Sequence, residues 1–177
     1  LLGPKSDVMD VDLDCREAKG LAELILPKPF AQFDRGTSDS GHYLYKANTC
    51  GPTKKFSGNG PKSTLVELRG DGSQTMIPPS IHPDGSRLNF TDINHDAPEV
   101  EYADLLKSVL FLAACFEVAQ IWVSGRRHEL ALSFSGLCLK QDVDPQLLVN
   151  IIQRICEITG DTEEQGRMNC VRTSVGK

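Results

Sequence analysis

Apolar and polar residues alternate over much of the first half of the chain, and this pattern predicts most of its elements. Residues 7–14 alternate acidic and apolar side chains, with a period near two from Asp10 on, which predicts a strand. Residues 17–26 are typical of a helix, and the prolines that follow end it. Three further strands are expected over 42–46, 63–69 and 74–77. The order of strand and helix predicts a mixed α/β sheet.

The second half of the chain changes to a helical pattern after Pro98. Helices are expected over 99–118, from near His128 to Leu139, and from Pro145 to about Thr159, with Asp144 as N-cap of the third. A capping box at residues 162–165 predicts a fourth helix. The expected fold is α/β (α+β), with a mixed-sheet core over residues 1–98 and a C-terminal helical bundle over residues 99–177.

Composition and charge narrow the class of protein. Hydrophobic residues make up 40% and charged residues 24% of the 177 residues, which excludes disordered and fibrous chains. The net charge of -5 does not favour nucleic-acid binding, so such binding must depend on local charge. The most apolar stretch, 105–123, contains Lys107 and Glu117, which favours a core helix over a membrane span. The first five residues carry no basic-then-apolar signal pattern, and the start close to a core strand suggests a piece of a longer protein.

The six cysteines are spread along the chain, and the closest two, Cys156 and Cys170, are fourteen residues apart. No CxxC pair exists for zinc or redox chemistry. A reducing cytosol without structural zinc is therefore the expected environment.

A pair of carboxylates lies on the first expected strand. Asp12 and Asp14 are two residues apart, so both side chains project from the same face. Two like charges held together are stabilised by a divalent cation, and oxygen ligands suit Mg²⁺ or Mn²⁺. The alternative is a solvated strand face.

Two further polar signals follow. Ser40-Gly41-His42 is a small-residue turn before a strand, where backbone N–H groups, the hydroxyl and the imidazole can hold a phosphate chain. Glu67 is flanked by apolar residues on an expected central strand, where a carboxylate is costly unless it is paired or binds a metal. The alternatives are a surface loop with an incidental histidine, and a Glu67 that points outward from an edge strand.

Together the three signals resemble a known catalytic signature. Asp-x-Asp, Ser-x-His and a strand acid, at spacings of thirty and twenty-five residues, are similar to the motifs of the archaeo-eukaryotic primase superfamily. The closest resemblance is to the bifunctional primase–polymerase domains of phage and plasmid replication proteins. Residues 6–14 and 66–85 resemble the segments around its first and third motifs, and 125–132 resembles the start of its helical extension. The likeness covers most of the chain.

The resemblance implies roles for individual residues. Asp12, Asp14 and Glu67 would bind the catalytic Mg²⁺ or Mn²⁺, although many members have Asp in place of Glu67. Ser40, Gly41 and His42 would hold the incoming triphosphate, with His42 part of the catalytic set. Lys46 and His82 are further nucleotide-binding candidates, with a solvated lysine and a loop-stabilising histidine as the alternatives. The candidates for nucleic-acid contact are Lys54, Lys55 and Lys62, whose alternative is a solvated loop, and Arg126, Arg127 and His128, whose alternative is a salt bridge to the front half.

The implied function is template-dependent nucleotidyl transfer by a two-metal mechanism, as a DNA primase and DNA-directed polymerase. The expected partners are a single-stranded DNA template, nucleoside triphosphates (dNTP or NTP) and a helicase domain fused downstream, without a membrane. The expected setting is phage or plasmid replication in the cytoplasm of a bacterial or archaeal host. The main alternative is a non-catalytic replication-initiator module on the same fold. An unrelated DxD phosphatase or sugar-nucleotide transferase is a third hypothesis, and for the phosphatase Cys15-Arg16 after Asp14 argues against it.

Overall fold

The fold is described from a computed structural model, which describes residues 1–36, 40–57 and 65–175. The chain divides into two compact units, Leu1–Ala113 and Ala114–Lys177. This division falls within helix α2 (Tyr102–Gln120). The domain boundary expected after residue 98 stays a prediction.

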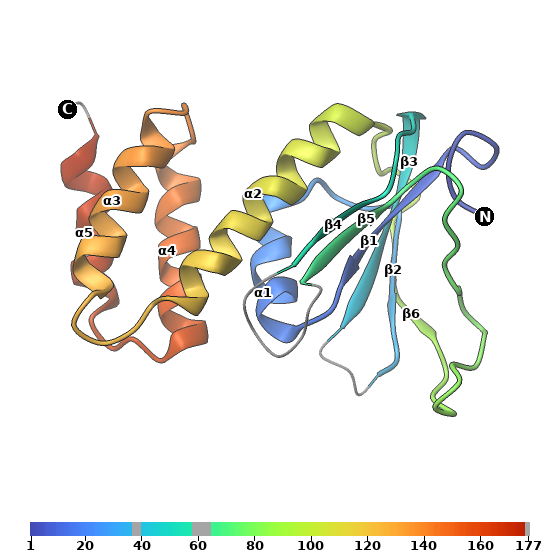
Figure 1. The fold of residues 1–177 in the computed structure, drawn as a ribbon, viewed down its shortest axis with the longest axis horizontal. Helices are drawn as coiled ribbons and strands as arrows, with labels where there is room; N and C mark the ends of the chain where they lie inside the picture. Colours follow the sequence, from blue (N-terminus) through green and yellow to red (C-terminus); the bar gives the residue numbers. More distant parts are fainter. Residues whose placement is uncertain (37–39, 58–64, 176–177) are drawn as a thin grey trace. The chain divides into compact units, whose positions relative to one another are not determined.

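The described part of the first unit contains a seven-stranded sheet (Figure 1). Six strands follow the order β4-β5-β1-β3-β2-β6, with every neighbour antiparallel, and β7 pairs with β3 in parallel. The sheet confirms the mixed α/β prediction. The strands are β1 (Val8–Leu13), β2 (Ala31–Asp34), β3 (Gly41–Thr49), β4 (Lys54–Phe56), β5 (Val66–Arg69), β6 (Asn89–Ile93) and β7 (Val100–Glu101).

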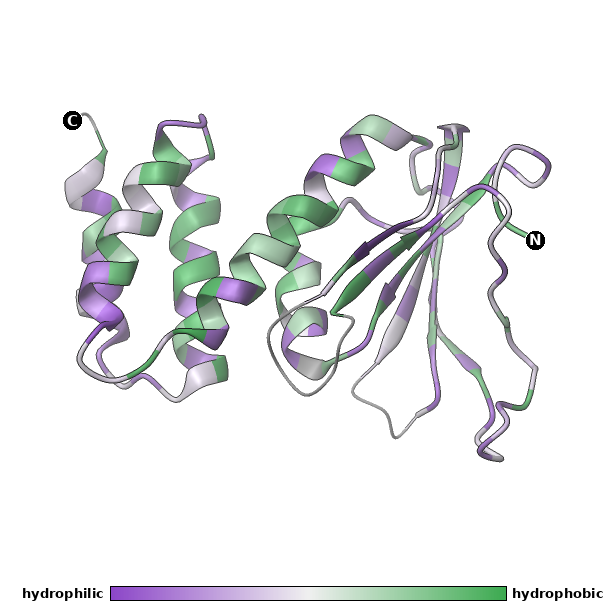
Figure 2. Ribbon diagram, viewed as in Figure 1, coloured by the Kyte–Doolittle hydropathy of each residue, from purple (hydrophilic) through white to green (hydrophobic). Residues whose placement is uncertain are grey.

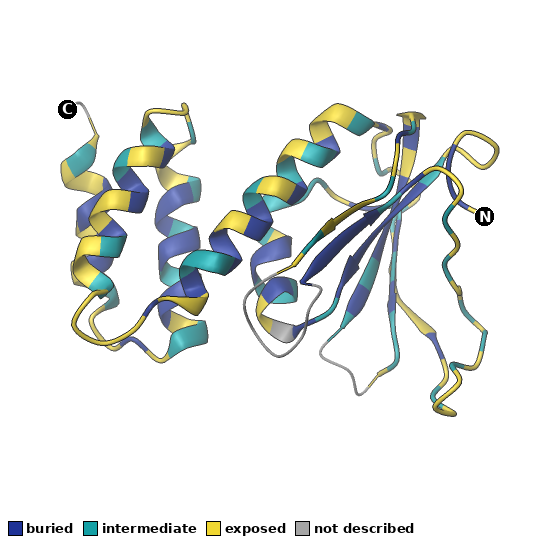
Figure 3. Ribbon diagram, in the orientation of Figure 1, coloured by how far each residue is buried: buried dark blue, intermediate teal, exposed yellow. Residues whose placement is uncertain are grey.

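The alternation along β1 separates an apolar face from a polar one. Met9, Val11 and Leu13 are fully buried, and their neighbours on β3 and β5 include Tyr45 and Leu68. Helix α1 (Arg16–Ile25) follows β1 and lies against it, with Ala18, Leu21 and Ala22 buried. In Figure 3 the central strands β1 and β5 are dark blue, whereas β6 is exposed along its length. The opposite face of β1 carries acidic residues.

The strands of the first unit differ from the sequence predictions at several places, and β7 lies where the start of a helix was expected. Residues 74–77 form no strand, because they run as irregular chain toward the Pro78–Pro79 pair. Strands β2 and β6 were not predicted, because the alternation of β2 extends over only four residues and β6, whose residues are all exposed, carries no regular alternation. Of the strand expected over 63–69, the described part is β5, and residues 63 and 64 lie outside the described residues.

The second unit contains helices α3 (Arg127–Leu139), α4 (Pro145–Thr159) and α5 (Glu164–Ser174). Helix α5 packs against both α3 and α4. The N-cap of α4 is confirmed, since the Asp144 carboxylate accepts a hydrogen bond from the backbone of Leu147 at 2.7 Å. The capping box is wrong, because α5 begins after Glu163 without a side-chain cap. That these helices make up a bundle domain stays a prediction.

Helices α2, α4 and α5 differ in their hydropathy. Figure 2 shows that α2 and α4 are largely hydrophobic, while α5 carries mostly polar residues. None of the helices in the described parts of the chain combines the length and the hydropathy that crossing a lipid bilayer requires.

Candidate active site

The three motif residues of the sheet lie in one row. Asp12 on β1 is the register partner of His42 on β3 and of Glu67 on β5. Directly opposed residues of antiparallel strands project from the same face, so these side chains are neighbours although they lie up to 55 residues apart (67 minus 12). Strand pairing thus brings the three motifs together.

A second acid of β1 positions the histidine. Asp10 is fully buried, and its Oδ2 lies 2.9 Å from Nδ1 of His42. The other ring nitrogen, Nε2, lies 3.6 Å from Oδ1 of Asp12. The ring of Phe33 stacks on the imidazole with the centroids 4.6 Å apart. Asp10 was not predicted as a site residue, although its place two residues before Asp12 puts it on the same strand face.

These contacts set the protonation of His42. Burial alone would lower the pKa of His42, but the hydrogen bond and charge of Asp10, together with the charge of Asp12, raise it above its ordinary value. The two carboxylates therefore favour the protonated form of the imidazole, whose Nε2 lies toward Asp12. A cationic donor in this position suits a phosphate oxygen.

An arginine joins the acids of β1 and β5. Arg69 donates through Nη2 to Asp12 Oδ2 and through Nε to Glu67 Oε2 at 3.0 Å, and Nη1 lies 3.8 Å from Asp10. Lys55 Nζ lies 3.1 Å from the second oxygen of Glu67. Arg69 was also missed, although it follows Glu67 by two residues on one strand and therefore shares its face.

The pKa of the Asp12 carboxyl differs from that of an ordinary aspartate. Burial raises the pKa of Asp12 to about 6, with smaller opposing effects from His42 and Arg69. The Asp12 carboxyl is therefore mostly ionised at neutral pH but takes up a proton more readily than an ordinary aspartate. Such shifts are common at functional sites.

A hollow of about 310 Å³ opens at this face of the sheet. Its wall includes five predicted site residues, namely Asp12, Asp14, Ser40, His42 and His82. Arg35, Arg69, Gln74, Thr75, Met76 and Leu88 complete the lining. The hollow thus has carboxylates on β1 and cationic side chains around them.

The donor set suits a divalent cation that is bound together with a substrate. Asp12 and Asp14 line the same hollow, and Mg²⁺ in phosphate-transfer sites is bound by one or two carboxylates, waters and substrate oxygens. Among the residues that the structure describes, no three Asp, Glu, His or Cys side chains are grouped to ligate one ion. Glu67 is not among the residues that line this hollow, and its two oxygens contact Arg69 and Lys55. The pair Asp12 and Asp14 therefore fits the expected metal better than the trio with Glu67.

The other predicted residues of the first unit lie outside this hollow. Gly41 opens β3 opposite Leu13, and Lys46 lines a separate, mainly apolar hollow of about 460 Å³. Lys54 and Lys55 are on β4, where Lys55 contacts Glu67. Lys62 lies outside the described residues.

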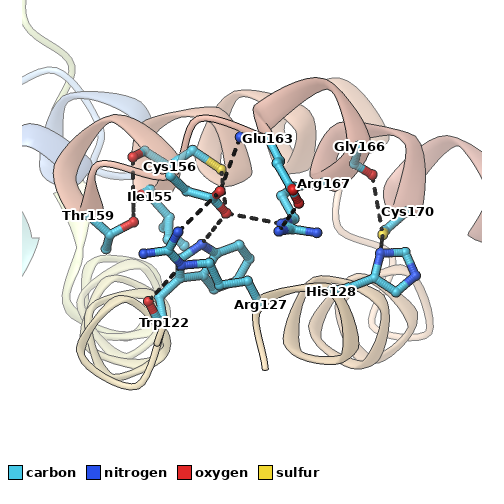
Figure 4. Close-up of polar contacts among 11 residues, drawn as sticks. Trp122, Arg127, His128, Ile155, Cys156, Thr159, Glu163, Gly166, Arg167 and Cys170 are labelled. Carbon is cyan, nitrogen blue, oxygen red and sulfur yellow. Dashed lines mark hydrogen bonds and ion pairs between the residues drawn. The ribbon is translucent and has the colours of Figure 1, made fainter. Parts of the chain in front are cut away.

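The basic residues predicted at the start of α3 belong to the second unit (Figure 4). Arg127 Nη1 lies 3.3 Å from Asp161 Oδ1, and its Nε donates to the carbonyl of Trp122 at 3.3 Å. The partner is therefore an acid of the same unit and not of the front half. His128 Nδ1 lies 3.7 Å from Cys170 Sγ, and Arg126 is exposed.

Asp161 is the centre of this second polar cluster. Its Oδ2 accepts hydrogen bonds from Trp122 Nε1 and Arg167 Nε, both at 3.0 Å, and its Oδ1 accepts from the backbone of Glu163. Burial alone would raise the pKa of Asp161, but the hydrogen bond from Arg167 and the others lower it below the ordinary value. The cluster joins the end of α2 to the α4–α5 connection and is structural.

Comparison with known families agrees with the arrangement of the sheet. The family model described as bifunctional DNA primase/polymerase, N-terminal, matches residues 1–103, a range that includes all seven strands and α1. Comparisons with curated proteins and with solved structures found no match. The family resemblance of the sequence motifs is thereby confirmed, and the chain belongs to the bifunctional DNA primase/polymerase family.

Proposed function

We propose that this chain catalyses template-dependent nucleotidyl transfer as a DNA primase and DNA-directed polymerase. Membership of the family supports primase or polymerase activity. The observation that carries the proposal is the row of Asp12, His42 and Glu67 across three strands, of which Asp12 and His42 line one hollow together with Asp14 and Ser40.

The hollow offers separate places for metal and phosphate. Asp12 and Asp14 would hold Mg²⁺ or Mn²⁺. A bound metal would stabilise the negative charge that develops on the attacking 3′-oxygen and on the leaving pyrophosphate. His42 and Ser40 would donate to the phosphate chain. Asp10 orients the His42 ring, because the hydrogen bond to Nδ1 leaves Nε2 toward the hollow. Positioning and charge stabilisation would supply most of the rate increase.

Glu67 has two proposed roles. Its contact with Arg69 holds the guanidinium beside Asp12, which balances the charge of the acids before substrate binds. Metal ligation by Glu67, as part of a two-metal site, stays a proposal that requires Arg69 and Lys55 to release its oxygens.

The proposed partners follow from the activity. A single-stranded DNA template and dNTP or NTP would be the substrates, in phage or plasmid replication in the cytoplasm of a bacterial or archaeal host, with a helicase domain downstream. The proposed contacts to the nucleic-acid backbone are exposed basic residues of each unit, namely Lys54, Lys55, Arg126 and His128. Arg127 is the weakest of the proposed contacts, since its guanidinium already contacts Asp161.

Incorporation of labelled nucleotide on a single-stranded template, with and without a primer and with Mg²⁺ or Mn²⁺, tests the proposal. Asp12→Asn and Asp14→Asn should each abolish incorporation. The matched control is Asp92→Asn, which removes an exposed acid of β6 and should leave the rate unchanged. Template binding without incorporation would support the non-catalytic initiator module instead.

A further inference from the structure

We propose that the apolar hollow beside the candidate active site is a docking site for an acidic peptide segment of a partner protein. A large apolar side chain of the segment enters the hollow, and a neighbouring carboxylate of the segment pairs with Lys46. The hollow has a volume of about 460 Å³, and all of its lining residues belong to the first unit. Lys46, which the sequence motifs made a candidate for nucleotide binding, lines this hollow and not the polar one.

The wall of the hollow is built mainly from aliphatic and aromatic side chains. The sheet contributes Val8 of β1, Leu44 of β3 and Ala31 of β2, which lie on one face. The other apolar lining residues are Leu1, Leu2, Phe30, Ile77, Phe90 and Ile93. Four of them are exposed, namely Leu1, Ile77, Phe90 and Ile93. Large apolar side chains that gather on a surface mark interaction sites, and volumes of about 300–1,000 Å³ are typical of ligand pockets.

A register shift in the β2–β6 pair brings two of these exposed side chains to the same face. Phe90 is the partner of Phe33, and Ile93 is the partner of Ala31. Residues three apart on a regular strand point to opposite faces, but the shift adds one residue to β6. Phe90 and Ile93 therefore both line the hollow, on the face that also carries His42. Bulges of this kind direct side chains toward a site.

One cation lies at this apolar surface without an acid to balance it. Lys46 is exposed, and its Nζ lies 6.0 Å from the centre of the Phe30 ring. Among the described residues Lys46 makes no ion pair, and the described lining holds no other lysine or arginine and no Asp or Glu. An apolar ligand that carries a carboxylate therefore matches the hollow in both hydropathy and charge.

Thr75 lies where the apolar hollow and the polar hollow meet, since it lines both. Its hydroxyl oxygen is buried and has no hydrogen-bond partner in the described part of the chain. A buried hydroxyl without a partner is costly, so a ligand that offers one gains affinity. The backbone of a peptide offers both donors and acceptors along its length.

The chemistry of the wall favours a peptide over single-stranded nucleic acid. A nucleic-acid strand binds along a groove with several cations and stacks its bases on aromatic side chains, whereas the described lining offers one lysine. A base among aliphatic side chains would also leave its polar edge without hydrogen-bond partners. A leucine or phenylalanine side chain has no polar atoms, so its burial carries no such cost.

Selection from a displayed library of random short peptides against the 177-residue chain tests the assignment. Enriched sequences should contain Leu, Ile or Phe next to Asp or Glu. Fluorescence anisotropy would then give the affinities of the enriched peptides, and of versions with Lys in place of their acids. Lys46→Glu should weaken binding of the acidic peptides by about tenfold or more and strengthen binding of the Lys versions, because the charge at the hollow is reversed. Ile93→Ser should weaken both by about tenfold.

Two controls repeat these changes elsewhere. Lys107→Glu reverses the charge of an exposed lysine on α2, and Leu137→Ser removes an exposed leucine of α3, and neither residue lines the hollow. Both controls should bind the peptides as the wild type does. Thermal unfolding of each variant separates lost binding from lost folding, and Lys46→Glu, at an exposed position, carries the test should Ile93→Ser unfold.

Several outcomes would overturn the proposal. These are a library without enriched sequences, enriched peptides that lack acids, and affinities that neither Lys46→Glu nor Ile93→Ser changes. A dimer that dissociates in Ile93→Ser during sedimentation would assign the hollow to a second copy of the chain instead. Binding of a single-stranded oligonucleotide that Ile93→Ser weakens, without peptide binding, would assign it to nucleic acid. Peptide docking does not depend on nucleotidyl transfer, so a chain that incorporates no nucleotide would leave this assignment standing.

Discussion

Oδ2 of Asp10 lies 2.9 Å from Nδ1 of His42, and the aspartate has no exposed surface. Its other oxygen, Oδ1, has no hydrogen-bond partner among the described residues. A buried carboxylate of this kind is stabilised by the charge of its partner. The relationship makes Asp10 a positioning residue, which acts on the substrate only through the imidazole.

Replacing Asp10 with Asn should lower both the pKa of His42 and the rate of nucleotide incorporation. The amide retains an acceptor for Nδ1 but removes the charge that raises the pKa of His42. Loss of an orienting partner of this kind typically costs about 10- to 100-fold in function. Titration of the His42 ring by NMR and steady-state kinetics would measure the two effects. Asp7→Asn, an exposed acid just before β1, is the control, and an unaltered His42 titration would contradict the assignment.

Removing the guanidinium that joins β1 and β5 should destabilise the first unit. Arg69→Gln leaves Asp12 and Glu67 buried beside each other without their shared cation. Breaking one side of a buried ion pair costs about 3 kcal/mol. Urea unfolding would measure the loss of stability. The control Arg87→Gln, which removes an exposed arginine, should show no such loss.

A second change checks whether the loss in Arg69→Gln arises from unpaired charge. Glu67→Gln combined with Arg69→Gln should recover part of the lost stability, because one uncompensated carboxylate is then absent. A double variant that is as unstable as the sum of the two single variants would show that the residues do not interact energetically.

The cluster around Asp161 should make the second unit sensitive to acid. Because the pKa of Asp161 in the folded state is below its ordinary value near 3.8, its contribution to stability is complete above that value and disappears as the pH falls through the folded pKa. Asp161→Asn should lose about 2 kcal/mol at pH 7 and become less dependent on pH. Trp122 is the only tryptophan of the chain and donates to Asp161, so its fluorescence reports the unfolding directly. Asp142→Asn, in an exposed turn, is the control.

Two glycine substitutions should change the free energy of unfolding in opposite directions. A Cβ on Gly70 would lie 2.0 Å from the carbonyl oxygen of Gly51, so Gly70→Ala must displace backbone and should cost about 3 kcal/mol or more. A Cβ on Gly136, inside α3, meets no atom within 4 Å. Gly136→Ala should therefore stabilise by about 0.5–1 kcal/mol through helix propensity. Thermal unfolding measures both, and a stable Gly70→Ala would show that the β5 end can move.

Local patterns predicted the elements whose signals are local. The N-cap and proline at Asp144 and Pro145 placed the start of α4, and the alternation from Asp10 placed β1. Strand β6 escaped prediction because all five of its residues are exposed and no alternation marks it. Residues 74–77 contain strand-forming side chains but no neighbour pairs with them.

Only those residues of the candidate site that belong to short sequence motifs were predicted. Asp12, Asp14, Ser40 and His42 come from short motifs with recognisable spacing, and they line one hollow. Arg69 and Asp10 have roles that depend on which strands are neighbours and on the register between them. A single sequence carries no direct record of that pairing, so their contacts became visible only in the folded chain.

The register of β1 places both the core residues and the residues of the proposed active site. Since side chains alternate along a strand, a slip of one residue between β1 and β3 would turn Asp10 and Asp12 into the apolar layer and bring Met9 and Val11 out to the substrate side. A misaligned sheet would then be both inactive and unable to bury its core. Measurement of the proposed nucleotide incorporation would therefore report strand alignment as well as chemistry, and molecules with a shifted pairing would form an inactive fraction that unfolds at a lower temperature.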